Sequence, residues 1–273
     1  MTTFPLLDRL ACPACRAPLA PGDGNLACTR CGAAYPVVEG AADLRPTTAE
    51  SRPEFHDWTR HWSGDNQQSV AQRFFSFYRK AVFARTVAYF IGRYFPPAGV
   101  FVEAGSGTAE TSMRIDKANG RRVLVAVDLV LPVVARCHPV MDVRIAGDIF
   151  RLPFADASLD GIWNVGVMEH FTHDLIDRIL VEFRRVLRPG APLLLLWPAT
   201  DSLPQKALRL VEKVVNLRPR GERFQFHPDE ISQLRSSAEG REVLRRNGLE
   251  PLQVDPGLRS LMAFKTVVGR KPA

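Results

Sequence analysis

The stretch VFVEAGSGTAE, residues 100–110, reads as a short apolar strand, a glycine-rich turn and the start of a helix. Glycines at such a turn let backbone N–H groups come close to a ligand. A dinucleotide fingerprint has a further glycine three residues after Gly107, where this chain has the carboxylate of Glu110. The sequence also has no Gly-Lys-Ser or Gly-Lys-Thr for a triphosphate. The turn therefore favours a ligand without phosphate groups.

Two acids flank this turn in the predicted fold. Glu103 precedes it, and Asp128 ends the next apolar stretch, VLVAVD, at residues 123–128. In open parallel sheets, ligands lie beyond the carboxyl ends of the strands. We expect Glu103 to face an amino group, directly or through water, and Asp128 to accept hydrogen bonds from a ribose diol. S-adenosylmethionine has an amine, a sulfonium and a ribose but no phosphate, and it fits both acids.

Strands and helices alternate along the rest of the chain. The predicted strands cover residues 100–104, 123–128, 143–148, 159–166, 191–198, 249–254 and 260–270, and the predicted helices residues 108–118, 131–137 and 172–187. This rhythm predicts a Rossmann-like, doubly wound α/β fold with a mostly parallel seven-stranded sheet. Residues 201–240 interrupt the rhythm and are predicted to form a helical lid. An aromatic-rich helix is expected over residues 70–94 and should contribute mostly core packing.

Four segments resemble, in order, the motifs of the class I S-adenosylmethionine-dependent methyltransferases, and the chain looks like their type 11 group. They are VEAGSGTA (102–109), VAVDL (125–129), GDIFRLPFADASLDGIWNVGVMEHF (147–171) and LRPGAPLLL (187–195). The likeness runs from about residue 98 to 198 and more loosely to 271. It implies an enzyme that transfers a methyl group from S-adenosylmethionine.

The resemblance also assigns cofactor-binding residues. It implies that Glu103, Gly105 and Gly107 contact the methionine end and that Asp128 contacts the ribose. It implies that Leu129, Asp148 and Ile149 contact the adenine, and that Asn164 and Val165 line the cofactor at the end of the fourth strand. Structural roles remain open for each of them. The glycines also suit a plain turn, and Asp128, Asp148 and Asn164 also suit caps or turns.

Four of the five cysteines form two Cys-x-x-Cys pairs, CPAC and CTRC, at Cys12, Cys15, Cys28 and Cys31. Two such knuckles facing each other make a closed tetrahedral site that suits structural zinc. No signal-peptide pattern is visible at the N-terminus, so we expect a cytoplasmic chain whose thiols stay reduced rather than form disulfides. Cys137 stands alone and is expected to be a buried apolar residue.

The cysteine segment resembles the zinc-ribbon family of small activator proteins that bind methyltransferases. The likeness rests on the two knuckles, on Tyr35-Pro36-Val37 and on the sequence from Leu44 to Pro46. It implies a built-in version of a separate activator, which would pack on the methyltransferase sheet and stabilise it. The expected domains are a zinc ribbon at 1–46, a linker with an N-terminal helical segment at 47–97, and a methyltransferase domain at 98–273.

The methyl acceptor is predicted to be a small or lipid-like molecule, because LPFADASLD followed by Glu169-His170 is most similar to methyltransferases of quinone, lipid and secondary-metabolite pathways. Two alternatives are an rRNA or tRNA acceptor and a non-catalytic binding module with this fold. The formal net charge of +7 allows RNA, but residues 1–50 carry one more acidic than basic side chain.

A general base is needed only if the accepting atom must lose a proton. The candidates are His170 and Glu169, with His173 nearby and His227 on the expected lid. Packing or capping explains His170 equally well. No apolar run of the sequence reaches the roughly 18 residues that a membrane-spanning helix needs, so no membrane span is predicted.

Overall fold

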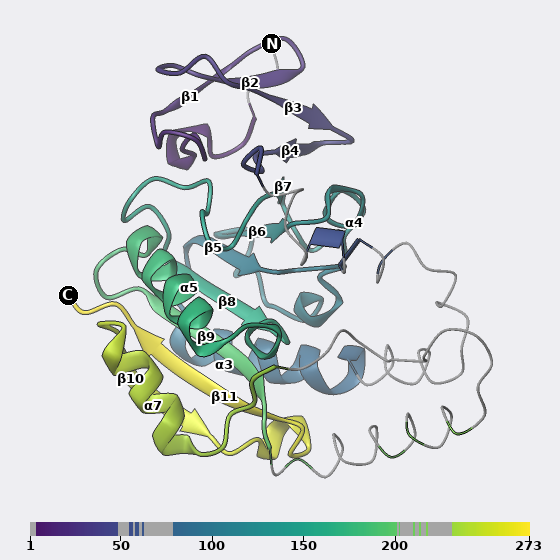
Figure 1. The fold of residues 1–273 in the computed structure, drawn as a ribbon, viewed down its shortest axis with the longest axis vertical. Coiled ribbons are helices and arrows are strands. Elements are labelled where there is room, and N and C mark those ends of the chain that lie inside the picture. The colour runs from purple at the N-terminus through teal and green to yellow at the C-terminus, as the bar shows by residue number, and fades with distance from the viewer. Residues whose placement is uncertain are drawn as a thin grey trace.

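The computed structural model describes residues 4–48, 79–200 and 231–273, together with residues 55, 56, 58, 59, 62, 202, 210, 213 and 217. A single sheet runs through these parts of the chain, in the order β1-β2-β3-β4-β7-β6-β5-β8-β9-β11-β10 (Figure 1). No helix of the described residues is long and apolar enough to cross a bilayer.

The seven-stranded part of the sheet confirms the predicted doubly wound fold. Its strands are β5 Gly99–Ala104, β6 Arg122–Asp128, β7 Val143–Ala146, β8 Gly161–Val165, β9 Pro192–Pro198, β10 Glu250–Asp255 and β11 Phe264–Arg270. The first five are parallel, whereas β11 runs antiparallel to both β9 and β10. Every residue of β9 is buried, as expected for a strand that is covered on both faces.

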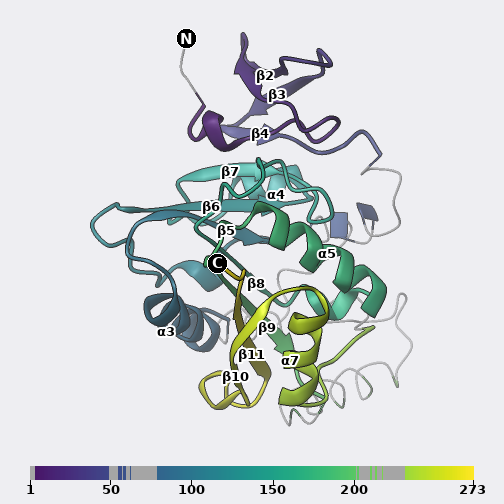
Figure 2. The same cartoon turned by 90° about the vertical axis from the view of Figure 1, so that its left-hand side faces the viewer.

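Helices cover both faces of this sheet (Figure 2). Helices α3 Ala84–Tyr94 and α4 Leu131–Ala135 lie on one face, with the buried Phe90 and Val134 in a shared cluster. Helices α5 His173–Val186 and α7 Ser237–Arg246 lie on the other. The buried residues of α5 recur at helical spacing, at Ile176, Ile179, Leu180, Phe183 and Val186, so one apolar face packs on the sheet.

The N-terminal ribbon continues the sheet beyond β7. Its strands are β1 Leu19–Pro21, β2 Asn25–Cys28, β3 Ala34–Val38 and β4 Ala41–Asp43. Strand β4 pairs in parallel with β7, with Ala42 opposite Ile145. Leu26 and Leu44 of the ribbon belong to the same buried cluster as Ile145. The ribbon and the α/β sheet therefore share one hydrophobic core, and the predicted domain boundaries stay a prediction.

The prediction of a helix at residues 108–118 is wrong. Only a 3-10 helix, Glu110–Ser112, forms there, and Ala109 before it has a left-handed backbone with φ of 54°. The hydroxyls of Thr111 and Ser112 bond to the Glu103 carboxylate, which ties this short helix to β5 in place of a longer helix. Ala118 and Asn119 also have positive φ, so the chain turns back before β6.

Other predicted helices are shorter or only partly described. The aromatic helix is seen from a π-helical turn at Arg79–Phe83 through α3, and the helix predicted at 131–137 ends at Ala135. Most of the predicted lid at 201–240 lies outside the described residues. From Ser237 onward the chain forms α7, which packs on β10 and β11 through Val243 and Leu244. Cys137 is buried in the core, as predicted.

Arg185 of α5 joins the helix to the loop after β7. Its guanidinium donates to both carboxylate oxygens of Glu182 at 2.8 and 2.6 Å, and to the carbonyls of Leu152 and Phe154 at 3.0 and 2.8 Å. Arg16 of the ribbon also forms an ion pair with Glu182, with 3.4 Å between Nη2 and Oε2. This network thus holds α5, the loop and the ribbon together.

Replacing Arg185 by methionine should lower the free energy of unfolding by roughly 3 kcal/mol, the lower end of the cost of leaving a buried carboxylate without its main partner. Arg16 still reaches Glu182, which is why the lower end applies. Denaturant unfolding measures the change. The control is Arg184→Met at the exposed neighbouring position, expected to stay within about 0.5 kcal/mol of the unchanged protein. Equal losses in both variants would contradict the role of Arg185.

Candidate functional site

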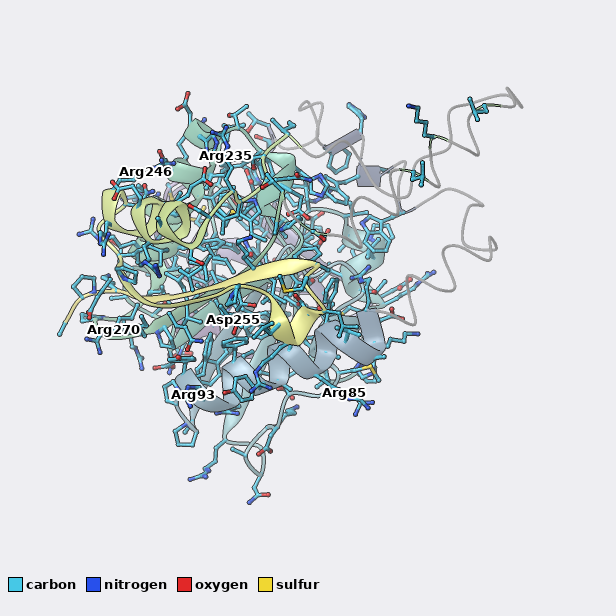
Figure 3. The ribbon with its side chains drawn as sticks, turned by 90° about the horizontal axis from the view of Figure 1, so that it is seen from below. Arg85, Arg93, Arg235, Arg246, Asp255 and Arg270 are labelled. Carbon is cyan, nitrogen blue, oxygen red and sulfur yellow. The ribbon has the colours of Figure 1, made fainter. Side chains whose placement is uncertain are left out.

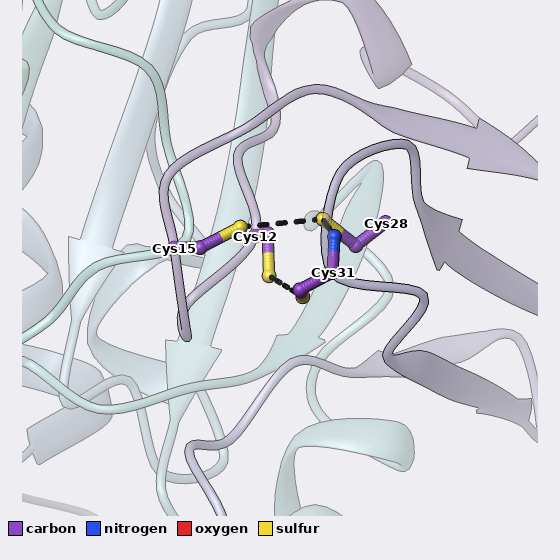
Figure 4. Close-up of side chains that lie close together, drawn as sticks. All are labelled: Cys12, Cys15, Cys28 and Cys31. Carbon is purple, nitrogen blue, oxygen red and sulfur yellow. Dashed lines mark hydrogen bonds between the residues drawn. The ribbon is translucent and has the colours of Figure 1, made fainter.

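The four predicted metal ligands lie together in the ribbon (Figure 4). The Sγ atoms of Cys12, Cys15, Cys28 and Cys31 are all within 4.8 Å of one another. Cys12 and Cys31 are 3.8 Å apart and Cys15 and Cys28 3.4 Å apart. Zinc–sulfur bonds of about 2.3 Å put tetrahedral ligands about 3.8 Å apart, so the cluster has the size that zinc requires.

The backbone builds both knuckles in the same way. The N–H of Arg16 bonds to the Cys12 carbonyl at 2.7 Å, and that of Gly32 to the Cys28 carbonyl at 3.2 Å. Arg16 and Gly32 both have positive φ, of 63° and 72°. The N–H groups of Arg30 and Cys31 point at Cys28 Sγ from 3.4 Å, as hydrogen bonds to a metal thiolate do. These four cysteines are arranged for a structural zinc ion.

The first knuckle contacts the loop that follows β7. The N–H of Ala11 donates to the Pro153 carbonyl at 3.0 Å, and the Arg151 guanidinium donates to the Ala14 carbonyl at 2.6 Å. This loop, residues 147–155, begins with the predicted adenine contacts Asp148 and Ile149. The metal centre and the predicted cofactor crevice are therefore joined through one short loop.

The glycine-rich turn is fastened to the neighbouring strand β6. The N–H groups of Gly105 and Ser106 donate to the Val127 carbonyl at 2.8 and 3.0 Å, and the N–H of Gly107 donates to Asp128 Oδ2 at 2.7 Å. Gly105 has φ of 74°, and a Cβ there would lie 2.7 Å from Val167. The turn thus needs a glycine at position 105 for both backbone and space.

Both predicted acids of the adenosine side lie buried at adjacent strand ends. Asp128 is 8% exposed and its second oxygen accepts the Val130 N–H at 3.0 Å, while Asp148 is 6% exposed and accepts the Phe150 N–H at 3.0 Å. Burial raises the pKa of Asp128. Leu129 and Ile149 next to them are half-exposed. Each carboxylate oxygen of Asp128 accepts one backbone N–H and keeps a second lone pair, which can accept from a ribose.

Glu103 lies beneath the turn. It is 1% exposed, and its two oxygens accept from the hydroxyls of Thr111 and Ser112 at 2.9 and 2.8 Å. Trp163 Nε1 donates to the Ser112 hydroxyl at 3.1 Å behind them. Burial raises the pKa of Glu103 to about 7. The sequence pattern did not reveal these two hydroxyl partners, and the predicted contact with an amino group stays a prediction.

Asn164, at the carboxyl end of β8, has a side chain that fits an absent ligand. It is fully buried, and neither Nδ2 nor Oδ1 has a hydrogen-bond partner among the described residues. Buried amides in proteins almost always have partners, and one without them needs an explanation. A polar group of a ligand bound at the strand ends would satisfy it, which agrees with the predicted S-adenosylmethionine crevice.

The predicted catalytic residues lie in a 3-10 helix, Met168–His170, just after β8. His170 Nε2 is 3.9 Å from Glu169 Oε1, and both side chains are largely buried. The N–H groups of Ile231 and Ser232 donate to the Glu169 carbonyl at 2.6 and 3.0 Å, which fixes this segment. His173 is exposed at the start of α5, and His227 lies outside the described residues.

Two tryptophans lie beside the predicted site. The sequence places them among aromatics that mostly suit core packing, some of which could line a pocket for an apolar substrate. The Trp58 ring meets the His170 ring edge to face at 4.8 Å. The Trp62 indole lies against the turn, where a Cβ on Gly107 would be 2.7 Å from it. Four residues separate the two tryptophans, which is the spacing of neighbours on one helix face. One therefore covers the turn and the other the predicted base.

Zinc analysis tests the metal centre. The purified chain should hold one zinc per molecule, and Cys12→Ser should remove it, because Cys12 is fully buried between the knuckles. The unfolding midpoint should fall by roughly 5–10 °C, since each kcal/mol lost lowers it by about 2–4 °C in a chain of this size. The control Cys137→Ser should keep the zinc. Full zinc content in Cys12→Ser would refute the site.

The pH dependence of stability tests the buried Glu103. Its pKa is raised from 4.5 to about 7, so the folded state holds this proton more tightly than the unfolded state. Its contribution to stability is fully present below pH 4.5 and is lost as the pH rises through about 7. The free energy of unfolding of Glu103→Gln, measured with denaturant, should not show this decline between pH 4.5 and about 7. An unchanged pH profile in Glu103→Gln would contradict the assignment.

Comparisons with protein families agree with both parts of the chain. Residues 102–195 match the family model described as "Methyltransferase domain", and residues 3–40 match "Trm112p-like protein". A protein of Micromonospora griseorubida described as "Putative 23S rRNA (guanine-N(1)-)-methyltransferase" is 33% identical over 112 residues, which are 40% of this chain and 35% of that protein. The match thus spans about a third of that relative.

Solved structures show the same fold at low sequence identity. The magnesium protoporphyrin IX methyltransferase of Synechocystis, with bound S-adenosylhomocysteine, is 16% identical at a TM-score of 0.52, over 81% of this chain and 96% of that one. The 1,6-didemethyltoxoflavin-N1-methyltransferase of Burkholderia thailandensis is 17% identical at a TM-score of 0.54. The match covers 90% of this chain and 98% of that one. The chain thus joins a segment that matches Trm112p-like proteins, with four clustered cysteines, to a part that matches the methyltransferase-domain model and has the fold of class I methyltransferases.

Proposed function

We propose that this protein transfers a methyl group from S-adenosylmethionine to a small-molecule or lipid-like acceptor. The observation that carries the proposal is the arrangement of polar groups at the carboxyl edge of the sheet. There a glycine turn is fastened to Asp128, and the buried Asn164 amide has no partner among the described residues. A degenerate binding module would have no need to keep both features.

The chain's own residues supply binding and alignment. Asp128 and Asp148 would accept from the ribose and the adenine, and Leu129 and Ile149 would lie against the adenine ring. The backbone of Gly105 and Gly107 would approach the methionine end. Bound S-adenosylmethionine supplies a methyl group on a sulfonium, which is already a good leaving group. The protein must mainly align donor and acceptor and exclude water, and Trp58 and Trp62 are placed to exclude it.

His170 is the proposed base for an acceptor that must lose a proton. Its ring lies beside Glu169 and against Trp58, at the end of the strand that carries Asn164. A neutral imidazole nitrogen there takes the proton of the accepting O–H or N–H as the new bond to the methyl carbon forms. Glu169 stabilises the imidazolium that results. The sequence also predicts Glu169 as a candidate base. Glu169 is only 4% exposed, which suits a role in orienting His170 better.

The Trp58 ring lies against His170, and further aromatic rings lie near the end of β8, which together favour an apolar acceptor. The Phe264 ring is 3.9 Å from where a Cβ of Gly166 would be, and it packs edge to face on Phe83 at 4.6 Å. Phe150 and Phe171 meet edge to face at 5.3 Å on the other side of the sheet end. These aromatic rings suit a hydrocarbon-rich acceptor more than a polar one.

An RNA acceptor is the second candidate, and a specific observation favours it. The relative from Micromonospora griseorubida is described as an rRNA guanine methyltransferase, and it shares 33% identity over 112 residues. The basic excess of the chain also lies mostly after residue 200. The acidic balance of the ribbon speaks against RNA, since phosphate contacts need positive surface.

Calorimetry tests the cofactor crevice. The zinc-loaded protein should bind S-adenosylhomocysteine, and Asp128→Ala should weaken binding by roughly 1–3 kcal/mol through the loss of a charged hydrogen-bond partner. Asp142→Ala is the matched control, because Asp142 also accepts a backbone N–H, from Leu124, but lies at the opposite end of β6. Unchanged affinity in Asp128→Ala would remove it from the site. No binding by a folded, zinc-loaded protein would favour the non-catalytic module.

Radiolabel transfer tests the acceptor class. The protein should move the labelled methyl group of S-adenosylmethionine into an organic-phase extract of small molecules and lipids, and His170→Ala should slow this transfer. His173→Ala is the control, since His173 is exposed at the start of α5. Label recovered in ribosomal RNA in place of the organic phase would establish the second candidate.

A further inference from the structure

The connection between β10 and β11 exposes three large apolar side chains within five residues. Leu258 is 70% exposed, Leu261 59% and Met262 39%. Single exposed apolar residues are common on protein surfaces, but several gathered on one loop mark a surface that contacts something else. Nothing in the proposed transfer chemistry uses these side chains.

The backbone of this connection is fixed in a strained form. Leu261 and Met262 both have positive φ, of 52° and 65°, a region that residues with a Cβ avoid. The buried Ser260 Oγ accepts the Phe264 N–H at 3.0 Å and lies 2.7 Å from the Phe264 carbonyl, and the Met262 N–H donates to the Gly257 carbonyl at 2.8 Å. The surrounding structure thus holds the apolar side chains outward, and such maintained strain is typical of functional surfaces.

Basic side chains lie near these apolar side chains, and the Asp255 carboxylate accepts the Gly257 N–H at 2.8 Å in the same connection. The Arg259 guanidinium stacks on the half-exposed Tyr89 ring of α3 at 3.4 Å, and the Thr86 hydroxyl lies 3.0 Å from the Arg259 carbonyl. Arg85 and Arg93 are exposed on the same helix. Figure 3 shows these two arginines toward the two ends of α3, with the β10–β11 connection lying against that helix. The loop and α3 therefore present apolar and basic groups together.

This surface adjoins the acceptor side of the crevice. Because β11 runs antiparallel to β9, with Phe264 opposite Pro198, the connection before β11 lies at the carboxyl edge of the sheet. Phe264 follows the loop directly and lies next to Gly166. The exposed loop and the segment that carries His170 thus lie at the same edge of the sheet.

We propose that this face docks on an anionic lipid bilayer. Leu258, Leu261 and Met262 enter the boundary of the acyl chains, while Arg85 and Arg259 lie among the phosphate headgroups. This docking rests on the proposed function, since it would bring the segment that carries His170 close to an acceptor held in the membrane. A lipid surface is favoured over RNA because aliphatic side chains have no flat face on which bases stack.

Vesicle sedimentation with the full, zinc-loaded chain tests the docking. The protein should sediment with phosphatidylcholine vesicles that contain phosphatidylglycerol, and less with phosphatidylcholine alone. The double variant Leu258→Ser/Leu261→Ser should lower the partition coefficient by roughly tenfold or more, from the lost apolar burial. Arg85→Glu should lower it too, and added salt should weaken binding. The control Val181→Ser changes a residue that is 56% exposed on α5, across the sheet, and should bind like the unchanged protein.

Circular dichroism confirms that each variant is folded before its binding is compared. Failure of the unchanged protein to sediment with anionic vesicles would overturn the proposal, and so would equal binding by the double variant. Binding to an RNA oligonucleotide that the double variant loses, with no binding to vesicles, would assign the face to RNA. Calorimetry with S-adenosylhomocysteine on the same samples reports separately on the crevice, so failure of docking and failure of the methyltransferase proposal are distinguishable.

Discussion

The backbone pairing of β4 with β7 is the interaction on which the rest of the structure depends. Without it, β7 would be an open edge of the parallel sheet, and open edges pair with other chains. Three residues on each strand form the pairing, from Ala41 opposite Arg144 to Asp43 opposite Ala146, and side chains of both parts close over it in one core. The ribbon is too small to have a separate core, so the zinc ligands and the sheet edge stabilise each other.

The same pairing brings metal and cofactor chemistry together. The zinc knuckle contacts residues 151–155, these contact Arg185 of α5, and the loop begins at Asp148. Above β5, Asp128 fastens the glycine turn while Glu103 fastens the 3-10 helix after it. Buried carboxylates on neighbouring strands thus hold the crevice in shape from two sides before any ligand enters.

Much of the fold was readable from the sequence because its signals are local. Buried parallel strands appear in the sequence as apolar runs such as LLLLW at 193–197, and paired Cys-x-x-Cys units predict a tetrahedral metal site. The prediction at residues 108–118 failed because of a tertiary contact. The Glu103 carboxylate accepts from the hydroxyls of Thr111 and Ser112, and no helical periodicity in the sequence indicates that contact. The aromatic content of residues 55–62 was visible, but only the tertiary structure brings Trp62 to Gly107 and Trp58 to His170. The β4–β7 pairing was likewise outside what local patterns record.

The covalent link between ribbon and sheet changes the thermodynamics of their association. Two separate chains would pair at this edge only in proportion to the concentration of the partner. On one chain the edge strand is always present at an effective concentration that the connecting segment sets. Dilution therefore cannot separate β4 from β7. The availability of zinc to the four cysteines is then the one external quantity on which the capped edge depends.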